Sequence, residues 1–163
     1  MPIVENERGR HRSHRFDASS DPAVLRSAVE VKARRIAHEW VEVELSPALV
    51  GHAFPTGDLF RRLAVEAEVL DDDGDVAGMD VKFLGRRFAD ERESGAHPTR
   101  RMIADDRVGA RGEQPVLVHL DLGPRATGRR VTWRVMYERV ELPDPEGEDM
   151  IAERIEISAG VLP

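Results

Sequence analysis

The sequence has 163 residues and a net charge of −7, with 40% apolar and 34% charged residues, as expected for one soluble globular domain rather than a disordered chain. It contains no cysteine, which excludes disulfides, thiolate zinc sites and covalent C-x-x-C-H haem attachment within the chain. No apolar run approaches the roughly 18–20 residues of a membrane span, and the N-terminus lacks the apolar core of a secretory signal.

The N-terminal segment 1–21 is the first predicted unit, an extended basic arm or linker. It is polar and has no hydrophobic periodicity, and residues 1–35 carry eight Arg and Lys against five Asp and Glu. Phe16 is the only Phe, Tyr or Trp in the arm, and the rest of the chain is acidic. We therefore expect no nucleic-acid binding.

A short helix is predicted next, and it opens the second unit, a β-sandwich domain over residues 22–163. Asp21 is a good N-cap, and Pro22 suits the first helical position. The helix is expected to end at about Ser27, because β-branched residues with a different period follow it.

From residue 29 the apolar residues recur with a period of two, which is typical of strands with one buried and one solvent-exposed face. The alternating segments are 29–33, 41–45, 63–69, 79–83, 116–122 and 131–137. "DDDGD" at Asp71–Asp75 predicts a hairpin, and "GPRATG" at Gly123–Gly128 links two further strands. The last segment, from Met150, fits either a final strand or a helical turn. The longest irregular stretch is predicted between Ala89 and Pro115.

These elements together predict an all-β fold: an Ig-like antiparallel β-sandwich of about seven strands, with an extended N-terminal arm and one short helix.

Catalytic motifs are absent from the sequence. The six histidines do not form H-E-x-x-H or another zinc pattern, and no serine lies in a G-x-S-x-G turn. His119 alternates with apolar neighbours and is expected to have a structural role. The glutamate pairs Glu42/Glu44 and Glu66/Glu68 are expected on the outward, solvated faces of strands. We therefore expect a protein that is not an enzyme.

The segment "GHAFPTG", Gly51–Gly57, is the least ordinary stretch. Gly51 permits an unusual backbone conformation, and Pro55 favours an extended Phe54, so the segment is a bend that leads into a strand. A structural bend needs no histidine, which leaves His52 without an evident structural purpose. On the residues alone, both a plain bend and a ligand role for His52 remain open.

The segment "VGHAFPTGDLFRRLAVEAEVLDDDGDV" resembles the G-H-x-F/L-P-T-G segment in the C-terminal β-domain of multihaem c-type cytochromes. "HRFDASSDPAVLRSAV" from His14 is similar to the linker that precedes this β-domain, and "DDRVGARGEQPV" from Asp105 to the family's D-x-R-then-G-E turn. The initial "MP" is similar to the residues after a haem-attachment motif. The resemblance extends from the start to about residue 140, but the haem-bearing C-x-x-C-H part is missing.

The resemblance implies a non-catalytic accessory module that packs on a haem-bearing region or cytochrome partner in electron transfer. His14 and His52 are its candidate axial ligands, since neutral imidazole commonly ligates haem iron. Haem is then available only through a partner or a missing region, and the location is extracytoplasmic, in the periplasm or at the cell surface. The alternative is an Ig-like binding or assembly module for adhesion, self-association as a homo-oligomer, or small-ligand capture.

Overall fold

The computed structural model describes residues 3–6, 9–12, 21–48, 52–57, 60–91, 99–142 and 149–163. For residues 3–6, 9–12, 90–91 and 99–100 it describes the backbone only. His14 and Gly51, which the sequence singled out, lie outside the described residues.

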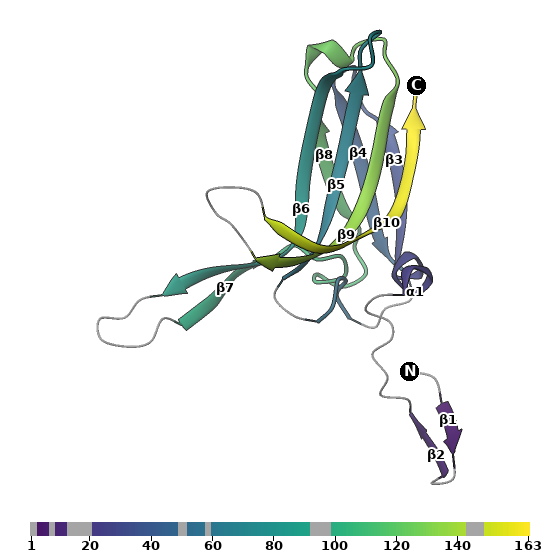
Figure 1. Cartoon of the computed structure of the whole chain (residues 1–163), viewed down its shortest axis with the longest axis vertical. Coiled ribbons are helices and arrows are strands. Elements are labelled where there is room, and N and C mark those ends of the chain that lie inside the picture. The colour runs from purple at the N-terminus through teal and green to yellow at the C-terminus, as the bar shows by residue number, and fades with distance from the viewer. Residues whose placement is uncertain are drawn as a thin grey trace.

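Two antiparallel sheets form the body of the molecule, which confirms the predicted all-β sandwich with eight strands in place of about seven. The five-stranded sheet has the order β10-β9-β5-β6-β7, and the three-stranded sheet has the order β3-β4-β8. In Figure 1, β3, β4 and β8 lie behind the longer strands of the larger sheet. The strands are β3 (Val29–Arg35), β4 (Trp40–Pro47), β5 (Arg61–Leu70), β6 (Val76–Glu91), β7 (Thr99–Asp105), β8 (Val116–Asp121), β9 (Val131–Leu142) and β10 (Met150–Leu162).

The core lies between the two sheets and consists of the apolar residues that alternate along the strands. Val41, Val43 and Leu45 of β4 are fully buried, as are Leu63 and Val65 of β5. Each such side chain contributes roughly 1.5–3 kcal/mol through its burial. The period of two in the sequence is therefore confirmed as the signal for the inner faces of these strands. It is wrong for segment 79–83, because Met79 and Phe83 of β6 are 59% and 51% exposed and Leu84 is the buried residue.

The short helix predicted after Asp21 is confirmed as α1 (Pro22–Ser27). Asp21 Oδ1 accepts a hydrogen bond from the Ala23 amide at 2.9 Å, and Leu25 is buried in the core. The arm before it contains a feature that the sequence did not predict, because β1 (Ile3–Asn6) and β2 (Gly9–Arg12) pair antiparallel as a separate two-stranded sheet. The division of the chain at residue 21 stays a prediction.

The turn at Asp71–Asp75 is the predicted hairpin and joins β5 to β6. Asp71 Oδ1 accepts hydrogen bonds from the amides of Asp73 and Asp75, and Gly74 has a φ of 89° that favours glycine. The predicted link at Gly123–Gly128 contains a short 3-10 helix, η2 (Pro124–Ala126), between β8 and β9.

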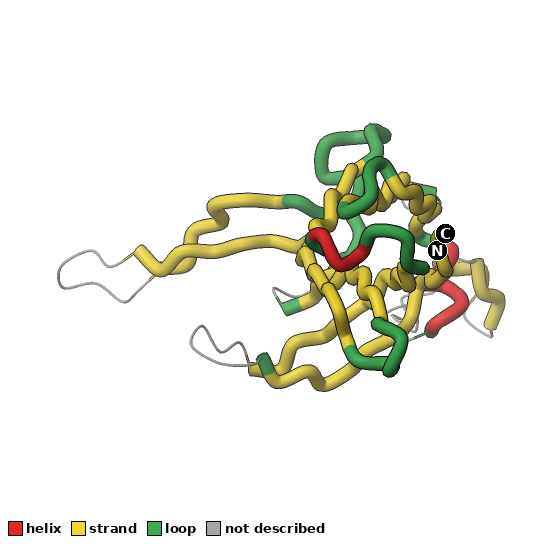
Figure 2. The backbone as a smooth tube through the Cα atoms, turned by 90° about the horizontal axis from the view of Figure 1, so that it is seen from above, coloured by secondary structure: helices red, strands yellow, loops and turns green. Residues whose placement is uncertain are grey.

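The prediction of an irregular stretch over residues 89–115 is wrong in its first part. β6 continues to Glu91, and β7 pairs antiparallel with it to form a hairpin. Figure 2 shows this hairpin extending away from the body. No alternating signal marks β7 in the sequence, because the adjacent Met102 and Ile103 are both exposed, at 50% and 59%. The ambiguous C-terminal segment is a strand, β10, which pairs with β9 along its length.

Candidate functional site

His52 lies on the connection between β4 and β5, and its side chain is exposed. Two residues further on, Phe54 is buried and joined to Val108 by an antiparallel β-bridge. The Phe54 amide donates to the Val108 carbonyl at 2.7 Å, and the Val108 amide donates back at 3.0 Å. The Phe54 ring stacks on Tyr137 of β9 with a centroid distance of 6.3 Å. His52 therefore stands just outside a segment that is anchored in the core.

Arginine side chains hold the carbonyl groups that follow Phe54. Arg107 Nη1 donates to the Pro55 carbonyl at 3.3 Å, Arg61 Nη1 donates to the Thr56 carbonyl at 3.1 Å, and Arg86 donates to the Gly57 carbonyl. The Phe54–Pro55 peptide is cis, and Gly57 has a φ of 104°. The loop backbone is thus fixed by residues from three other parts of the chain.

Arg107 is itself held by Asp105 through a two-pronged ion pair. Arg107 Nε donates to Asp105 Oδ1 at 2.8 Å, and Arg107 Nη2 donates to Asp105 Oδ2 at 2.7 Å. This hydrogen bonding lowers the pKa of Asp105 and raises the pKa of Arg107. The structure therefore brings together the two segments that carry the resemblance, the described part of "GHAFPTG" and "DDRVGARGEQPV".

The chemistry available at this end of the molecule is that of an accessible imidazole on a fixed loop. No hydrogen bond or ion pair joins the His52 ring to another described residue. A ring in this state can donate a nitrogen lone pair to a metal centre brought by a partner. Over the described part of the chain, no three His, Asp or Glu side chains are grouped so as to hold a metal ion.

The expectation that Glu42 is solvated is wrong. Glu42 faces outward from the smaller sheet but is only 7% exposed, because His119 and Arg34 cover it. His119 Nε2 lies 3.0 Å from Glu42 Oε2, and Arg34 Nη2 lies 2.6 Å from Glu42 Oε1. The hydrogen bond with His119, followed by that with Arg34, lowers the pKa of Glu42. This arrangement gives His119 a structural contact, in agreement with its predicted role.

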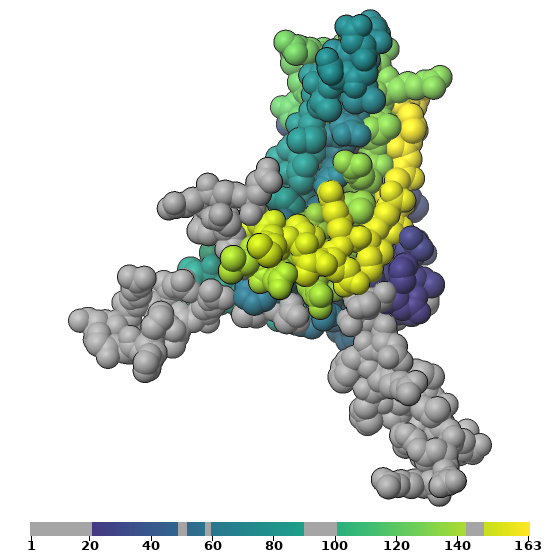
Figure 3. All heavy atoms as spheres, viewed as in Figure 1, coloured from purple at the N-terminus to yellow at the C-terminus, as the bar shows by residue number. Residues whose placement is uncertain are grey.

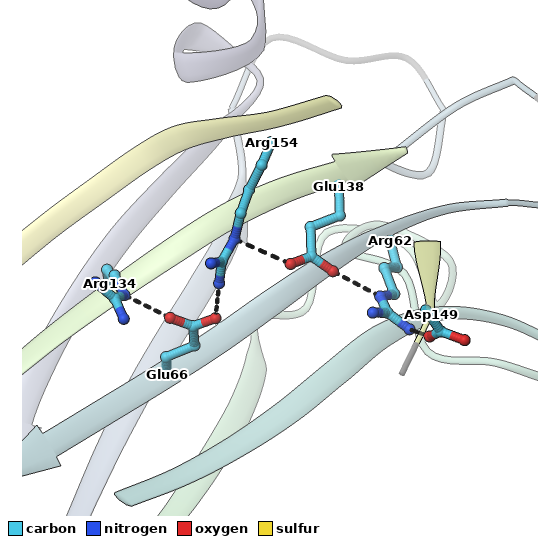
Figure 4. Close-up of polar contacts among 6 residues, drawn as sticks. All are labelled: Arg62, Glu66, Arg134, Glu138, Asp149 and Arg154. Atoms are coloured by element: carbon cyan, nitrogen blue, oxygen red, sulfur yellow. Dashed lines mark hydrogen bonds and ion pairs between the residues drawn. The ribbon is translucent and has the colours of Figure 1, made fainter. Parts of the chain in front are cut away.

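Glu66 is likewise not solvated, because it belongs to an ion-pair network on the outer face of the larger sheet (Figure 4). Glu66 binds Arg134 of β9 and Arg154 of β10. Arg154 Nε also lies 3.1 Å from Glu138 Oε1, and Glu138 is only 4% exposed. These contacts tie β10 across β9 to β5.

Arg62, near the start of β5, extends the network to Asp149, which directly precedes β10. Its Nε donates to Glu138 Oε2 at 2.7 Å, its Nη1 lies 2.5 Å from Asp149 Oδ2, and its guanidinium carbon lies 3.8 Å from the centre of the Phe83 ring. Sequence reasoning missed this network. The available signal was a pair of opposite charges four residues apart, on or directly next to each of two predicted strands: Arg62 with Glu66 and Arg134 with Glu138.

Comparison with known proteins bears on the fold. No protein-family model matches the chain, and no curated protein matches it significantly. Among solved structures, the chain is similar to a penta-haem cytochrome c552 from Thermochromatium tepidum, with a TM-score of 0.55 and 17% sequence identity. The match covers 83% of this chain and 40% of the cytochrome chain, so this chain spans less than half of that protein. At this identity the similarity concerns the fold alone.

No described helix has the length and apolar character needed to cross a membrane.

Proposed function

We propose that this chain is a non-catalytic β-sandwich module of a multihaem electron-transfer system, which packs on a haem-bearing region or partner and presents His52 to a haem iron. The observation that carries this proposal is an exposed imidazole next to a loop that is fixed in the core, within a fold similar to that of a penta-haem cytochrome. A partner of this kind favours an extracytoplasmic location. His14 enters as a second ligand on the sequence resemblance.

The residues fit a ligand role but not a covalent haem site. His52 is exposed and has no described partner that competes for its ring nitrogens. The absence of cysteine excludes a thioether bond to haem within this chain. The haem therefore has to be held by another chain or segment, and His52 supplies one axial nitrogen from outside.

A haem peptide with one open axial position tests this proposal directly. We expect the purified wild-type chain to convert the ferric haem peptide to a six-coordinate low-spin form, seen as a shift of its Soret band. His52→Ala should weaken this conversion, and the additional change His14→Ala should weaken it further. His38→Ala is the matched control, because His38 is also exposed but lies between β3 and β4. Equal titrations by wild type and the His14/His52 double variant would refute the proposal.

The β6–β7 hairpin favours the second candidate function, a module for self-association. An isolated two-stranded hairpin is only marginally stable in water, and this one exposes Met102 and Ile103 on adjacent positions of β7. A second copy of the chain that covers both faces would account for them. Sedimentation of wild type and of a Met102→Lys/Ile103→Lys variant over a range of concentrations distinguishes a homo-oligomer from a monomer.

A further inference from the structure

The His52 loop, residues 52–57, lies against the segment that follows β7. Val108 of this segment exchanges two backbone hydrogen bonds with Phe54, at 2.7 and 3.0 Å. Gly109 has a φ of 81° and lies so close to Ala53 that a Cβ on it would be 3.6 Å from the Ala53 Cα. Because Ala53 directly follows the histidine in the chain, this contact is one residue away from the exposed imidazole.

Arg107 continues the same contact in the opposite direction, and Asp105 fixes Arg107. Arg107 Nη1 donates to the Pro55 carbonyl at 3.3 Å. The Asp105 carboxylate accepts hydrogen bonds from Arg107 Nε at 2.8 Å, from Nη2 at 2.7 Å and from the Arg107 amide at 3.3 Å. These three bonds hold both the backbone and the guanidinium of Arg107, whose side chain is only 16% exposed.

The base of the β6–β7 hairpin places Asp105 in turn. Asp105 is the last residue of β7 and is paired with Arg86 of β6, and the Arg86 guanidinium donates to the Gly57 carbonyl. The hairpin base therefore holds the His52 loop at two points, at Pro55 through Asp105 and Arg107 and at Gly57 through Arg86.

We propose that Asp105 is a positioning residue for His52, because it fixes Arg107 and thereby holds the loop in the conformation that presents the imidazole to a haem iron. This inference rests on the proposed ligand role of His52. A ligand whose backbone is fixed before binding loses less entropy, and its apparent affinity scales with the fraction of molecules in the competent conformation. The two-pronged ion pair is the strongest part of this clamp, since both of its hydrogen bonds join charged groups.

Asp105→Asn tests the proposal, because it removes the charge and nearly keeps the shape of the side chain. In titrations with the ferric haem peptide that has one open axial position, we expect this variant to bind about threefold to tenfold more weakly than wild type. Its spectrum at saturation should remain six-coordinate and low-spin, because His52 is still present. Asp105→Glu keeps the carboxylate and should restore part of the affinity.

Asp106→Asn is the matched control, because the same chemical change at the next residue affects a different ion pair. Asp106 Oδ2 lies 2.9 Å from Arg87 Nη2, and no hydrogen bond or ion pair joins Arg87 to a described residue of the His52 loop. This variant should bind the haem peptide as tightly as wild type does.

Arg35→Met controls for a general loss of stability. Arg35 is paired with Val41 near the start of β4 and donates to the Pro163 carbonyl at 2.9 Å, whereas His52 follows the end of β4. Figure 3 shows the last residues of β10, in yellow, at the upper end of the body, and Figure 1 shows β4 ending at the lower end. Arg35→Met should therefore lower stability and leave ligation unchanged.

Hydrogen exchange follows the His52 loop without haem. The amides of Phe54 and Val108 form the two bonds that join the loop to the segment after β7, so their exchange rates report on the opening of this contact. Both amides should exchange faster in Asp105→Asn than in wild type or Asp106→Asn.

Combination with His52→Ala decides whether Asp105 acts through His52. The chain has six histidines, so some ligation remains in His52→Ala, and adding Asp105→Asn should weaken it no further. Wild-type affinity of Asp105→Asn, with or without faster exchange, would overturn the proposal, as would an equal loss of affinity in the His52→Ala background. Unchanged ligation by His52→Ala alone would instead refute the proposed function, and the role of Asp105 with it.

Discussion

Gly78 of β6 lies against the backbone of Leu122, which follows β8 of the other sheet, and Gly78→Ala should destabilise the protein. A Cβ on residue 78 would lie 2.2 Å from the Leu122 carbonyl oxygen, whereas non-bonded carbon contacts are optimal at ~3.5 Å. The obstructing atom belongs to the backbone, so the two sheets must separate to admit the methyl group. Close by, Asp80 Oδ2 accepts a hydrogen bond from the Asp121 amide at 3.0 Å, and this bond spans the same gap.

Three contributions set the expected change in the free energy of unfolding of Gly78→Ala. Overpacking costs roughly 1–3 kcal/mol, and weakening the Asp80–Asp121 hydrogen bond costs about 1 kcal/mol. Replacing glycine within a strand returns roughly 0.5–1 kcal/mol. We therefore expect Gly78→Ala to lower the free energy of unfolding by about 1–3 kcal/mol, measured by urea denaturation monitored by circular dichroism.

Gly85→Ala on the same strand is the matched control. Its Cβ would lie 3.3 Å from Arg62 Cβ, a contact that a shift of a few tenths of an ångström relieves. This variant should remain close to wild type in stability. A Gly78→Ala protein as stable as wild type or as Gly85→Ala would refute the reasoning from sheet approach.

Three further predictions concern charged side chains. Because the pKa values of Glu42 and Asp105 are lowered in the folded state, each carboxylate stabilises the fold above its ordinary pKa and loses this contribution as pH falls through the folded-state pKa. The free energy of unfolding should therefore decrease below about pH 5, and this decrease should be smaller in Glu42→Gln. Arg35→Met should cost about 2–4 kcal/mol in chemical denaturation, because its guanidinium donates to four backbone carbonyls at 2.5–2.9 Å. Arg154→Met should lower the melting temperature more than Arg139→Met does, because Arg154 pairs with the buried Glu66 and Glu138.

The sequence was sufficient for elements whose signals are local. The start of α1 was predictable from two adjacent residues, Asp21 as N-cap and Pro22 at the first helical position. The Asp71–Asp75 turn was predictable because the Asp71 side chain accepts hydrogen bonds from amides of the same turn and Gly74 supplies the positive φ. The core strands were readable for a similar reason, since each needs only its own alternation to bury one face.

Features that depend on strand register were not predictable in the same way. Glu66 is buried only because β9 pairs with β5 so that Arg134 lies directly opposite, 68 residues away in the chain. Glu42 is buried because β8 places His119 on one side of it and β3 places Arg34 on the other. A polar residue at every second position predicts an outward face, but a partner on the neighbouring strand decides whether that face is wet. The β6–β7 hairpin escaped prediction because neither of its faces is covered by the core.

The described geometry around His52 bears on why a histidine occupies this bend. A bend alone needs the restricted φ of Pro55 and the positive φ that Gly57 permits. Arginines from β5, from β6 and from the segment after β7 also bind the carbonyls of residues 55–57. Fixing a loop before a ligand arrives reduces the entropy that binding has to overcome. The His52 side chain next to this fixed segment is exposed. A rigid backbone with an accessible imidazole is the combination that a ligand for an iron held by another chain requires, and a plain bend does not require it.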